Sequence, residues 1–77
     1  MNITMANLRE KLREIDWEVD VDSLKDEAPL VEQGLDSLDM ITLLFCVEKE
    51  FPVKIPDDDV DGLKSLKDFV AYINERI

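Results

Sequence analysis

The stretch Gly34-Leu35-Asp36-Ser37-Leu38-Asp39 decides the fold, because it marks the point where a long helix begins. Gly34 breaks the preceding segment, and Asp36 or Ser37 can accept hydrogen bonds from the free N–H groups of a helix start. Asp39 adds negative charge to the first turn, where the helix dipole favours it. Pro52 ends the pattern, so we predict a helix from near Ser37 to just before Pro52. Its wide apolar face consists of Leu38, Ile41, Leu44, Phe45, Val47 and Phe51.

Two further amphipathic segments and one short turn complete the predicted helices. The first segment has apolar residues at mostly three- and four-residue spacing, namely Ile3, Met5, Leu8, Leu12 and Ile15. The last segment opens with Ser65 and Asp68, which have the spacing of a capping box, and runs to Ile77. Its inward face is expected to consist of Leu66, Phe69, Val70, Ile73 and Ile77. Before it lies a short helical turn, with Pro56 at its first position and Gly62 at its end.

A long connection joins the first two helices. Residues 17 to 21 alternate between apolar and charged, which is also typical of a strand, but the sequence offers no second strand to pair with them. We therefore interpret the segment as a loop held on the core by Trp17, Val19, Val21, Leu24, Leu30 and Val31. The prediction is an all-α fold and a single domain over residues 1–77. Its architecture is a small bundle of three main helices plus one short helical turn, with a long loop between the first and second helices.

Acidic residues dominate the chain, with nineteen Asp and Glu against nine Lys and Arg and a net charge of -10. The excess lies between Asp16 and Asp61, which hold fifteen acids and three bases. Such a field repels nucleic acid and anionic lipid and attracts partners with basic patches. The longest apolar-rich run, Met40 to Val47, is far shorter than the ~20 residues of a membrane helix. We expect no nucleic-acid partner, no membrane insertion, a monomer and, in the absence of a signal-peptide pattern, a cytoplasmic location.

The chain lacks the groups that would make Ser37 a catalytic nucleophile. A serine hydroxyl needs a base, but there is no histidine, and Lys49 lies about three helical turns away. We therefore expect no catalytic residue, no dedicated metal site and no enzymatic activity of the chain's own. From the residues alone, Ser37 is either a helix cap or a site that another enzyme modifies, since a helix start favours the negative charge of a phosphodiester.

The motif around Ser37 resembles the attachment motif of acyl carrier proteins, usually written Gly-x-Asp-Ser-Leu. The resemblance to the family extends along the whole chain, at Pro29-Leu30, Glu48-x-Glu50-Phe51, Ile55-Pro56-Asp57 and Tyr72-Ile73-Asn74. The resemblance implies a free-standing, type II carrier with a 4'-phosphopantetheine arm on Ser37, between Asp36 and Leu38. A phosphopantetheinyl transferase places this arm from coenzyme A with magnesium, and acyl groups are held on its terminal thiol as thioesters for acyl-loading and acyl-transfer enzymes.

The resemblance also implies two surfaces around the arm. Acids on the exposed face of the second helix are expected to attract basic docking patches, and these are Asp36, Asp39, Glu48 and Glu50. An acyl pocket is expected at positions that also suit ordinary core, namely Leu44, Val47, Ile55, Val60 and Leu63. Thr42 and Lys49 stand where carriers of fatty acid synthesis tend to have acids. The pathway therefore stays open between fatty acid, specialised lipid and polyketide synthesis.

Two functions of other classes remain as alternatives. One is an acidic helical interaction module that binds a basic partner without a prosthetic group. The other is a calcium-binding module, because Asp57-x-Asp59-x-Asp61-Gly62 matches the first half of a calcium loop and Asp68 falls at its twelfth position. Lys64 occupies the eighth position, where an apolar residue is expected, and Asp68 replaces the usual glutamate.

Overall fold

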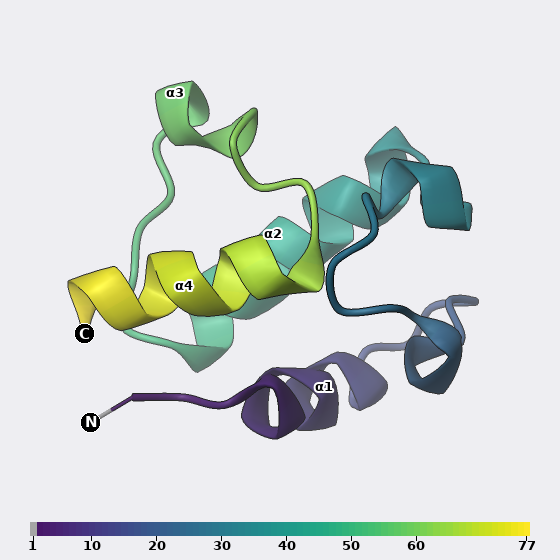
Figure 1. The fold of residues 1–77 in the computed structure, drawn as a ribbon, viewed down its shortest axis with the longest axis horizontal. Helices are drawn as coiled ribbons and strands as arrows, with labels where there is room; N and C mark the ends of the chain where they lie inside the picture. Colours follow the sequence, from purple (N-terminus) through teal and green to yellow (C-terminus); the bar gives the residue numbers. More distant parts are fainter. Residues whose placement is uncertain (1) are drawn as a thin grey trace.

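The computed structural model describes residues 2–77, which form helices and connections and, within this range, no strand. The four α-helices are α1 (Met5–Arg13), α2 (Ser37–Glu50), α3 (Asp57–Val60) and α4 (Leu66–Arg76), and two short 3₁₀ turns precede α2, at Val21–Ser23 and Val31–Gln33. In Figure 1, α4 crosses in front of α2, α1 lies below them and α3 above. The all-α prediction, with three main helices, one short turn and a long loop, is confirmed.

Each main helix begins with a capping box, in which two side chains satisfy two backbone N–H groups reciprocally. The pairs of capping residues are Thr4 with Asn7, Asp36 with Asp39, and Ser65 with Asp68. The third pair was predicted, and of the two cap candidates for α2 the structure selects Asp36. The first pair explains why α1 starts at Met5, two residues after the first apolar residue of the predicted segment.

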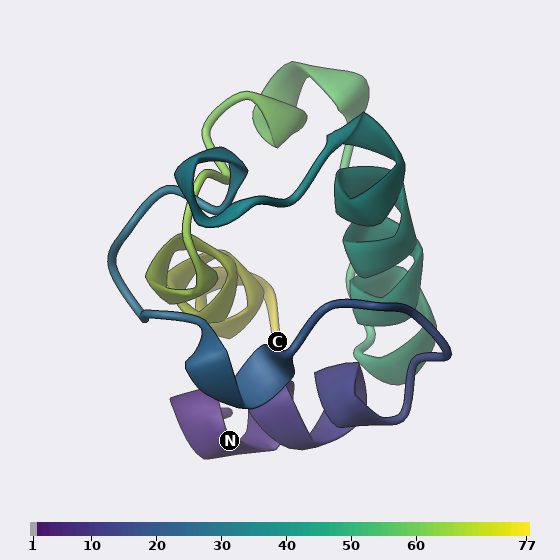
Figure 2. The same ribbon diagram turned by 90° about the vertical axis from the view of Figure 1, so that its right-hand side faces the viewer.

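The core forms where the inward faces of α1, α2 and α4 meet. Figure 2 views α4 end-on, with α2 beside it and α1 below. Fully buried side chains come from all three helices and from the loop: Leu8, Leu12, Leu30, Leu43, Val47, Leu66, Phe69 and Ile73. Burial of one such side chain contributes about 1.5–3 kcal/mol. On α4, Tyr72 takes the inward place that was predicted for Ile77, which is exposed because it lies beyond the end of the helix.

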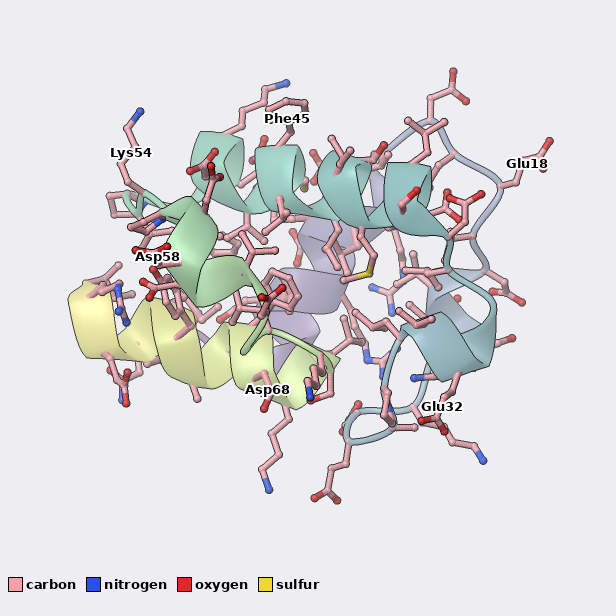
Figure 3. All side chains as sticks on the ribbon, turned by 90° about the horizontal axis from the view of Figure 1, so that it is seen from above. Glu18, Glu32, Phe45, Lys54, Asp58 and Asp68 are labelled. Atoms are coloured by element: carbon pink, nitrogen blue, oxygen red, sulfur yellow. The ribbon has the colours of Figure 1, made fainter. Side chains whose placement is uncertain are left out.

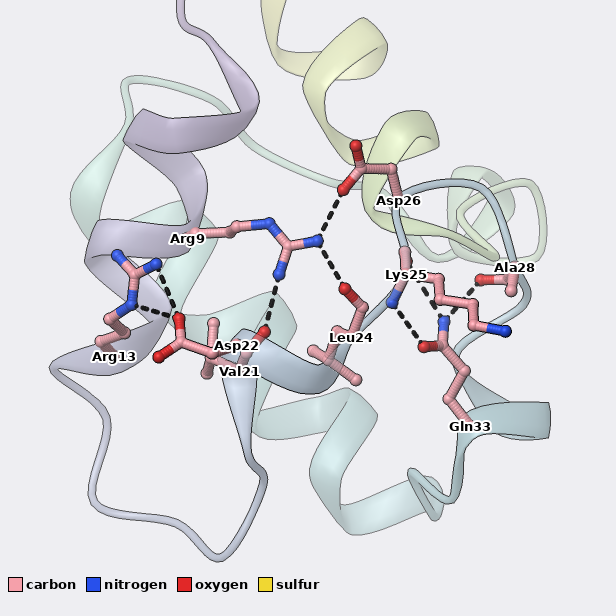
Figure 4. A network of polar contacts seen from close by, with 9 residues as sticks. All are labelled: Arg9, Arg13, Val21, Asp22, Leu24, Lys25, Asp26, Ala28 and Gln33. Carbon is pink, nitrogen blue, oxygen red and sulfur yellow. Dashed lines mark hydrogen bonds and ion pairs between the residues drawn. The ribbon is translucent and has the colours of Figure 1, made fainter.

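A half-buried guanidinium fixes the connection between α1 and α2 (Figure 4). Arg9 of α1 donates from Nη1 to the carbonyl of Val21, at 2.7 Å, and from Nη2 to the carbonyl of Leu24, at 2.6 Å. The same Nη2 pairs with the carboxylate of Asp26. Because Val21 and Leu24 are themselves buried, Arg9 holds the backbone between two of the loop's core anchors.

The rest of the connection is tied to α4 and to itself. The N–H of Leu30 donates to the carbonyl of Lys64, at 2.7 Å, and the Gln33 side chain bonds the backbone of Lys25 and Ala28. Val31 does not anchor the loop as predicted, because its side chain is 68% exposed on a 3₁₀ turn that presents Leu30 to the core instead.

A polar cluster holds the short helix α3 against α4. The Tyr72 hydroxyl donates to Asp59 Oδ2, at 2.7 Å, and the Arg76 guanidinium lies 3.5 Å from the same oxygen and 3.5 Å from the centre of the Tyr72 ring. Pro56 caps α3 from the position before its first residue, one place earlier than predicted. No helix within residues 2–77 is both long and apolar enough to cross a membrane.

Candidate functional site

Ser37 is the first residue of α2, and its side chain is exposed. Gly34, at φ +100°, ends the preceding turn in the left-handed region that favours glycine. Asp36 then accepts a hydrogen bond from the N–H of Asp39, at 2.9 Å, and Asp39 accepts one from the N–H of Asp36, at 3.2 Å. The backbone N–H groups of Ser37 and Leu38 and the Ser37 hydroxyl make no hydrogen bond within the described residues.

The four acids predicted to form a docking row do not share one exposed face. Asp36 is exposed and Asp39 half-buried, both beside Ser37. Glu48 is half-buried and accepts a hydrogen bond from the N–H of Ile55, at 2.8 Å, and Glu50 is half-buried with its Oε1 3.4 Å from Lys11 Nζ. Glu48 and Glu50 are therefore only partly exposed, because each has a partner in a neighbouring segment, and their part in docking stays a prediction.

Three large apolar side chains of α2 point to solvent, and we call them the α2 stripe. They are Leu38, 69% exposed, Ile41, 47% exposed, and Phe45, 68% exposed. All three were predicted to face inward, but the buried face of α2 is formed by Leu43 and Val47. Residues at spacings of three and four lie on one side of a helix, so the stripe is continuous and begins beside Ser37. The three- and four-residue spacing of these side chains is visible in the sequence, but the sequence does not show that they face solvent.

Four of the five residues predicted to line an acyl pocket lie in the core or against it. Val47 and Leu63 are buried, Leu44 and Ile55 are half-buried against them, and Val60 of α3 is half-buried. The structure thus places four of the five on the inner side of the fold, and the role of all five as a lining for an acyl chain stays a prediction.

A groove separates the first part of the α1–α2 connection from the start of α2, and we call it the loop groove. It has a volume of about 920 Å³. Apolar side chains from both sides form its walls, including Trp17, Val19, Leu24, Leu35 and Leu38. The Trp17 Nε1 is buried without a hydrogen-bond acceptor, an arrangement that costs about 1–3 kcal/mol. Sequence analysis used Trp17 and Val19 only as loop anchors and missed the groove.

Two of the four carboxylates of the suspected calcium loop bind other groups of the chain. Asp59 binds Tyr72 and Arg76, and Asp68 accepts hydrogen bonds from the N–H groups of Lys64 and Ser65 at the start of α4. Within residues 2–77 no three His, Cys, Asp or Glu side chains are arranged to hold a metal ion.

Cys46 lies half-buried on α2, with its Sγ 3.8 Å from the carbonyl oxygen of Lys11. Burial raises the pKa of this thiol, and the nearby carboxylates of Glu50 and Glu14 raise it further. The side chain is therefore a protonated thiol at neutral pH.

Comparison with known proteins identifies the family. The phosphopantetheine attachment site family matches residues 6–73, which include the whole of α2. A carrier from Zymomonas mobilis named acyl carrier protein is 39% identical over 75 residues, covering 92% of this chain and 96% of that protein. The chain belongs to the acyl carrier protein family. An acyl carrier protein from Bdellovibrio bacteriovorus is also 39% identical, over 59 residues that cover 75% of this chain and 76% of that carrier.

The family defines the chemistry of this carrier. Its prosthetic group is 4'-phosphopantetheine, and the carrier holds acyl groups for acyl-handling enzymes without catalytic activity of its own. This agrees with a chain that has no histidine. The two alternative functions, an interaction module without prosthetic group and a calcium-binding module, are not favoured.

Proposed function

We propose that Ser37 is the residue that carries the arm and that the exposed side of α2 presents it to partner enzymes. The strongest support is the difference in exposure and hydrogen bonding among the three serines. The Ser37 hydroxyl is open and has no hydrogen-bond partner within the described residues, whereas Ser23 Oγ donates to Asp20, at 2.6 Å, and Ser65 is buried as the cap of α4. A modifying enzyme can reach Ser37 without breaking any part of the fold.

The start of α2 fits a phosphodiester. The N–H groups of Ser37 and Leu38 are available as donors, and the positive end of the helix dipole lies there. In the capping box, the carboxylates of Asp36 and Asp39 accept hydrogen bonds from the backbone. When attached, 4'-phosphopantetheine supplies a thiol that bears the acyl group as a thioester. The residues of the chain hold the phosphate end and keep the attachment point exposed.

The α2 stripe supports a docking role for this face of the helix. Exposed apolar residues in a continuous row mark interaction surfaces more often than scattered ones do. Asp36 and Asp39 lie at the end of the stripe nearest Ser37, so the surface suits a partner with an apolar contact and a basic patch, such as the phosphopantetheinyl transferase or an acyl-transfer enzyme. Glu48 and Glu50 contribute charge but less direct contact, because they are paired within the fold.

A loading reaction tests the proposal. The purified apo protein is incubated with coenzyme A, magnesium and a broad-specificity phosphopantetheinyl transferase, and the intact mass is measured. We expect one arm on the native chain and on Ser23→Ala, the matched control at another exposed serine, and none on Ser37→Ala. An arm on Ser37→Ala, or none on the native chain, contradicts the proposal.

A further inference from the structure

The loop groove begins beside Ser37; it shares Leu38 with the α2 stripe, and its deepest lining consists of the core residues Leu24 and Leu35. Asp36 and Leu38, the two neighbours of Ser37, form part of its wall, and Thr42 extends the wall one turn further along α2. In Figure 3, Glu18 of the opposite wall lies near the start of α2, whereas Asp58 of α3 lies toward the other end of that helix. The groove shares no lining residue with the predicted acyl pocket. Its volume of about 920 Å³ lies within the range of small-molecule sites.

The charges around the groove restrict what it can hold. Five carboxylates belong to its lining and no lysine or arginine does; the acids are Asp16, Glu18, Asp20, Asp36 and Asp39. Such a rim repels free fatty acids, nucleotides and other anions. A neutral chain that is already tethered at the edge of the groove avoids this repulsion, and the tether gives it an effective concentration in the millimolar range.

The loop segment that lines the groove has backbone donors without a hydrogen-bond partner next to apolar side chains. The backbone N–H groups of residues 16–20 make no hydrogen bond within the described part of the chain. Trp17 and Val19 of the same segment turn half-buried side chains toward the core, and the Trp17 indole N–H has no acceptor. A segment with unused backbone donors and alternating apolar side chains is suited to a peptide-like chain.

We propose that the loop groove binds the pantetheine portion of the arm on Ser37, whose amide groups pair with the backbone of residues 16–20. This inference rests on the proposed attachment at Ser37. The pantetheine portion is neutral, carries amide carbonyls that match the free N–H groups, and has branched apolar carbons that match Trp17 and Val19. The arm then alternates between a position in the groove, shielded from solvent, and an extended position in which its thiol reaches a partner enzyme.

Trp17 is the single tryptophan of the chain, so its fluorescence reports on the groove directly. We compare the quenching of apo and holo protein by acrylamide, a neutral quencher that the acidic rim does not repel. Intact mass on the same samples verifies that one arm is attached. We expect quenching of Trp17 to fall about twofold in the holo protein, because the tether keeps the groove occupied for much of the time. Equal quenching of the apo and the fully loaded protein overturns the inference.

Two glutamate variants separate the groove from a general effect of the arm. Val19→Glu adds a charge inside the groove, and Val31→Glu makes the same change at an exposed valine outside it. The difference between apo and holo quenching should disappear in Val19→Glu and persist in Val31→Glu; its persistence in both overturns the inference.

Backbone amide chemical shifts of the native apo and holo chains provide a readout that needs no variant. Shifts that change at residues 16–20 support binding in the groove, and changes confined to residues next to Ser37 overturn it. If no arm is found on Ser37 at all, the proposed attachment fails and this inference fails with it, whereas a loaded Ser37 with an unchanged Trp17 overturns the groove alone.

Discussion

Replacing Arg9 with methionine tests how the long connection is held in place. Methionine keeps an unbranched side chain and a similar helix propensity, but it is shorter and has no hydrogen-bond donor. Arg9 is only 15% exposed, and it donates to the carbonyls of Val21 and Leu24, which lie in buried parts of the loop. A hydrogen bond from a charged donor contributes about 1.5–3 kcal/mol, and water can replace part of this at a site that is not fully closed. The exposed pair with Asp26 adds at most about 1 kcal/mol.

These contributions predict a loss of about 3 kcal/mol in the free energy of unfolding for Arg9→Met. A chain of this size has a total stability of about 4–12 kcal/mol, so the loss is a large fraction of it. It corresponds to a fall in Tm of roughly 12–24 °C, at about 4–8 °C for each kcal/mol in a domain of this length. Urea and thermal unfolding followed by far-UV circular dichroism measure both quantities.

Arg13→Met is the matched control. Arg13 is also on α1, and it pairs at 2.8 Å with Asp22, but both side chains are exposed and the guanidinium meets no buried carbonyl. We expect a loss below about 1 kcal/mol, which added salt reduces further. The reasoning is refuted if Arg9→Met is no more destabilising than Arg13→Met, because the loop would then be held by its apolar anchors alone.

Three other predictions concern the docking face, α3 and the thiol. Phe45→Ala should lower kcat/KM of the transferase roughly 5–30-fold, as for an interface anchor, while the free energy of unfolding changes by no more than about 0.5 kcal/mol. Val31→Ala, at a residue that is equally exposed but lies off the α2 stripe, should leave kcat/KM unchanged. Equal effects of the two substitutions on kcat/KM would contradict the docking role. Tyr72→Phe removes the hydrogen bond to Asp59 and should speed amide exchange in residues 57–64 but not in α1; unchanged exchange would show that apolar contacts hold α3. Because burial raises the pKa of Cys46, its reaction with a disulfide reagent should accelerate at a higher pH in the folded protein than in the urea-unfolded protein; coinciding pH profiles would contradict this.

The sequence was sufficient to predict the helices because their limits are set by local chemistry. Ser65 with Asp68 and Pro52 act on the residues next to them, and α4 and α2 begin and end accordingly. Sequence analysis also reached the family, since the residues around Ser37 and along the whole chain resemble its members.

Other features depended on packing between distant segments and could not be predicted. α2 carries apolar residues on more than one side, so only its packing into the core beside α1 determines that Leu43 is buried and Phe45 exposed. Glu48 is drawn inward by the N–H of Ile55, which a helical pattern does not contain. The loop groove likewise depends on the path of the connection, which Arg9 holds at its middle through a contact over fifteen residues to Leu24.

The most direct test of the account is the position of the arm in the loaded protein. Trypsin releases residues 26–49 as one peptide, in which Ser37 is the only serine and Thr42 the only threonine. Fragmentation of this peptide by tandem mass spectrometry distinguishes the two hydroxyl groups. We predict the 4'-phosphopantetheine mass on Ser37 and nowhere else in the chain. An arm on Thr42, on Ser23 or on any other residue would contradict the central claim.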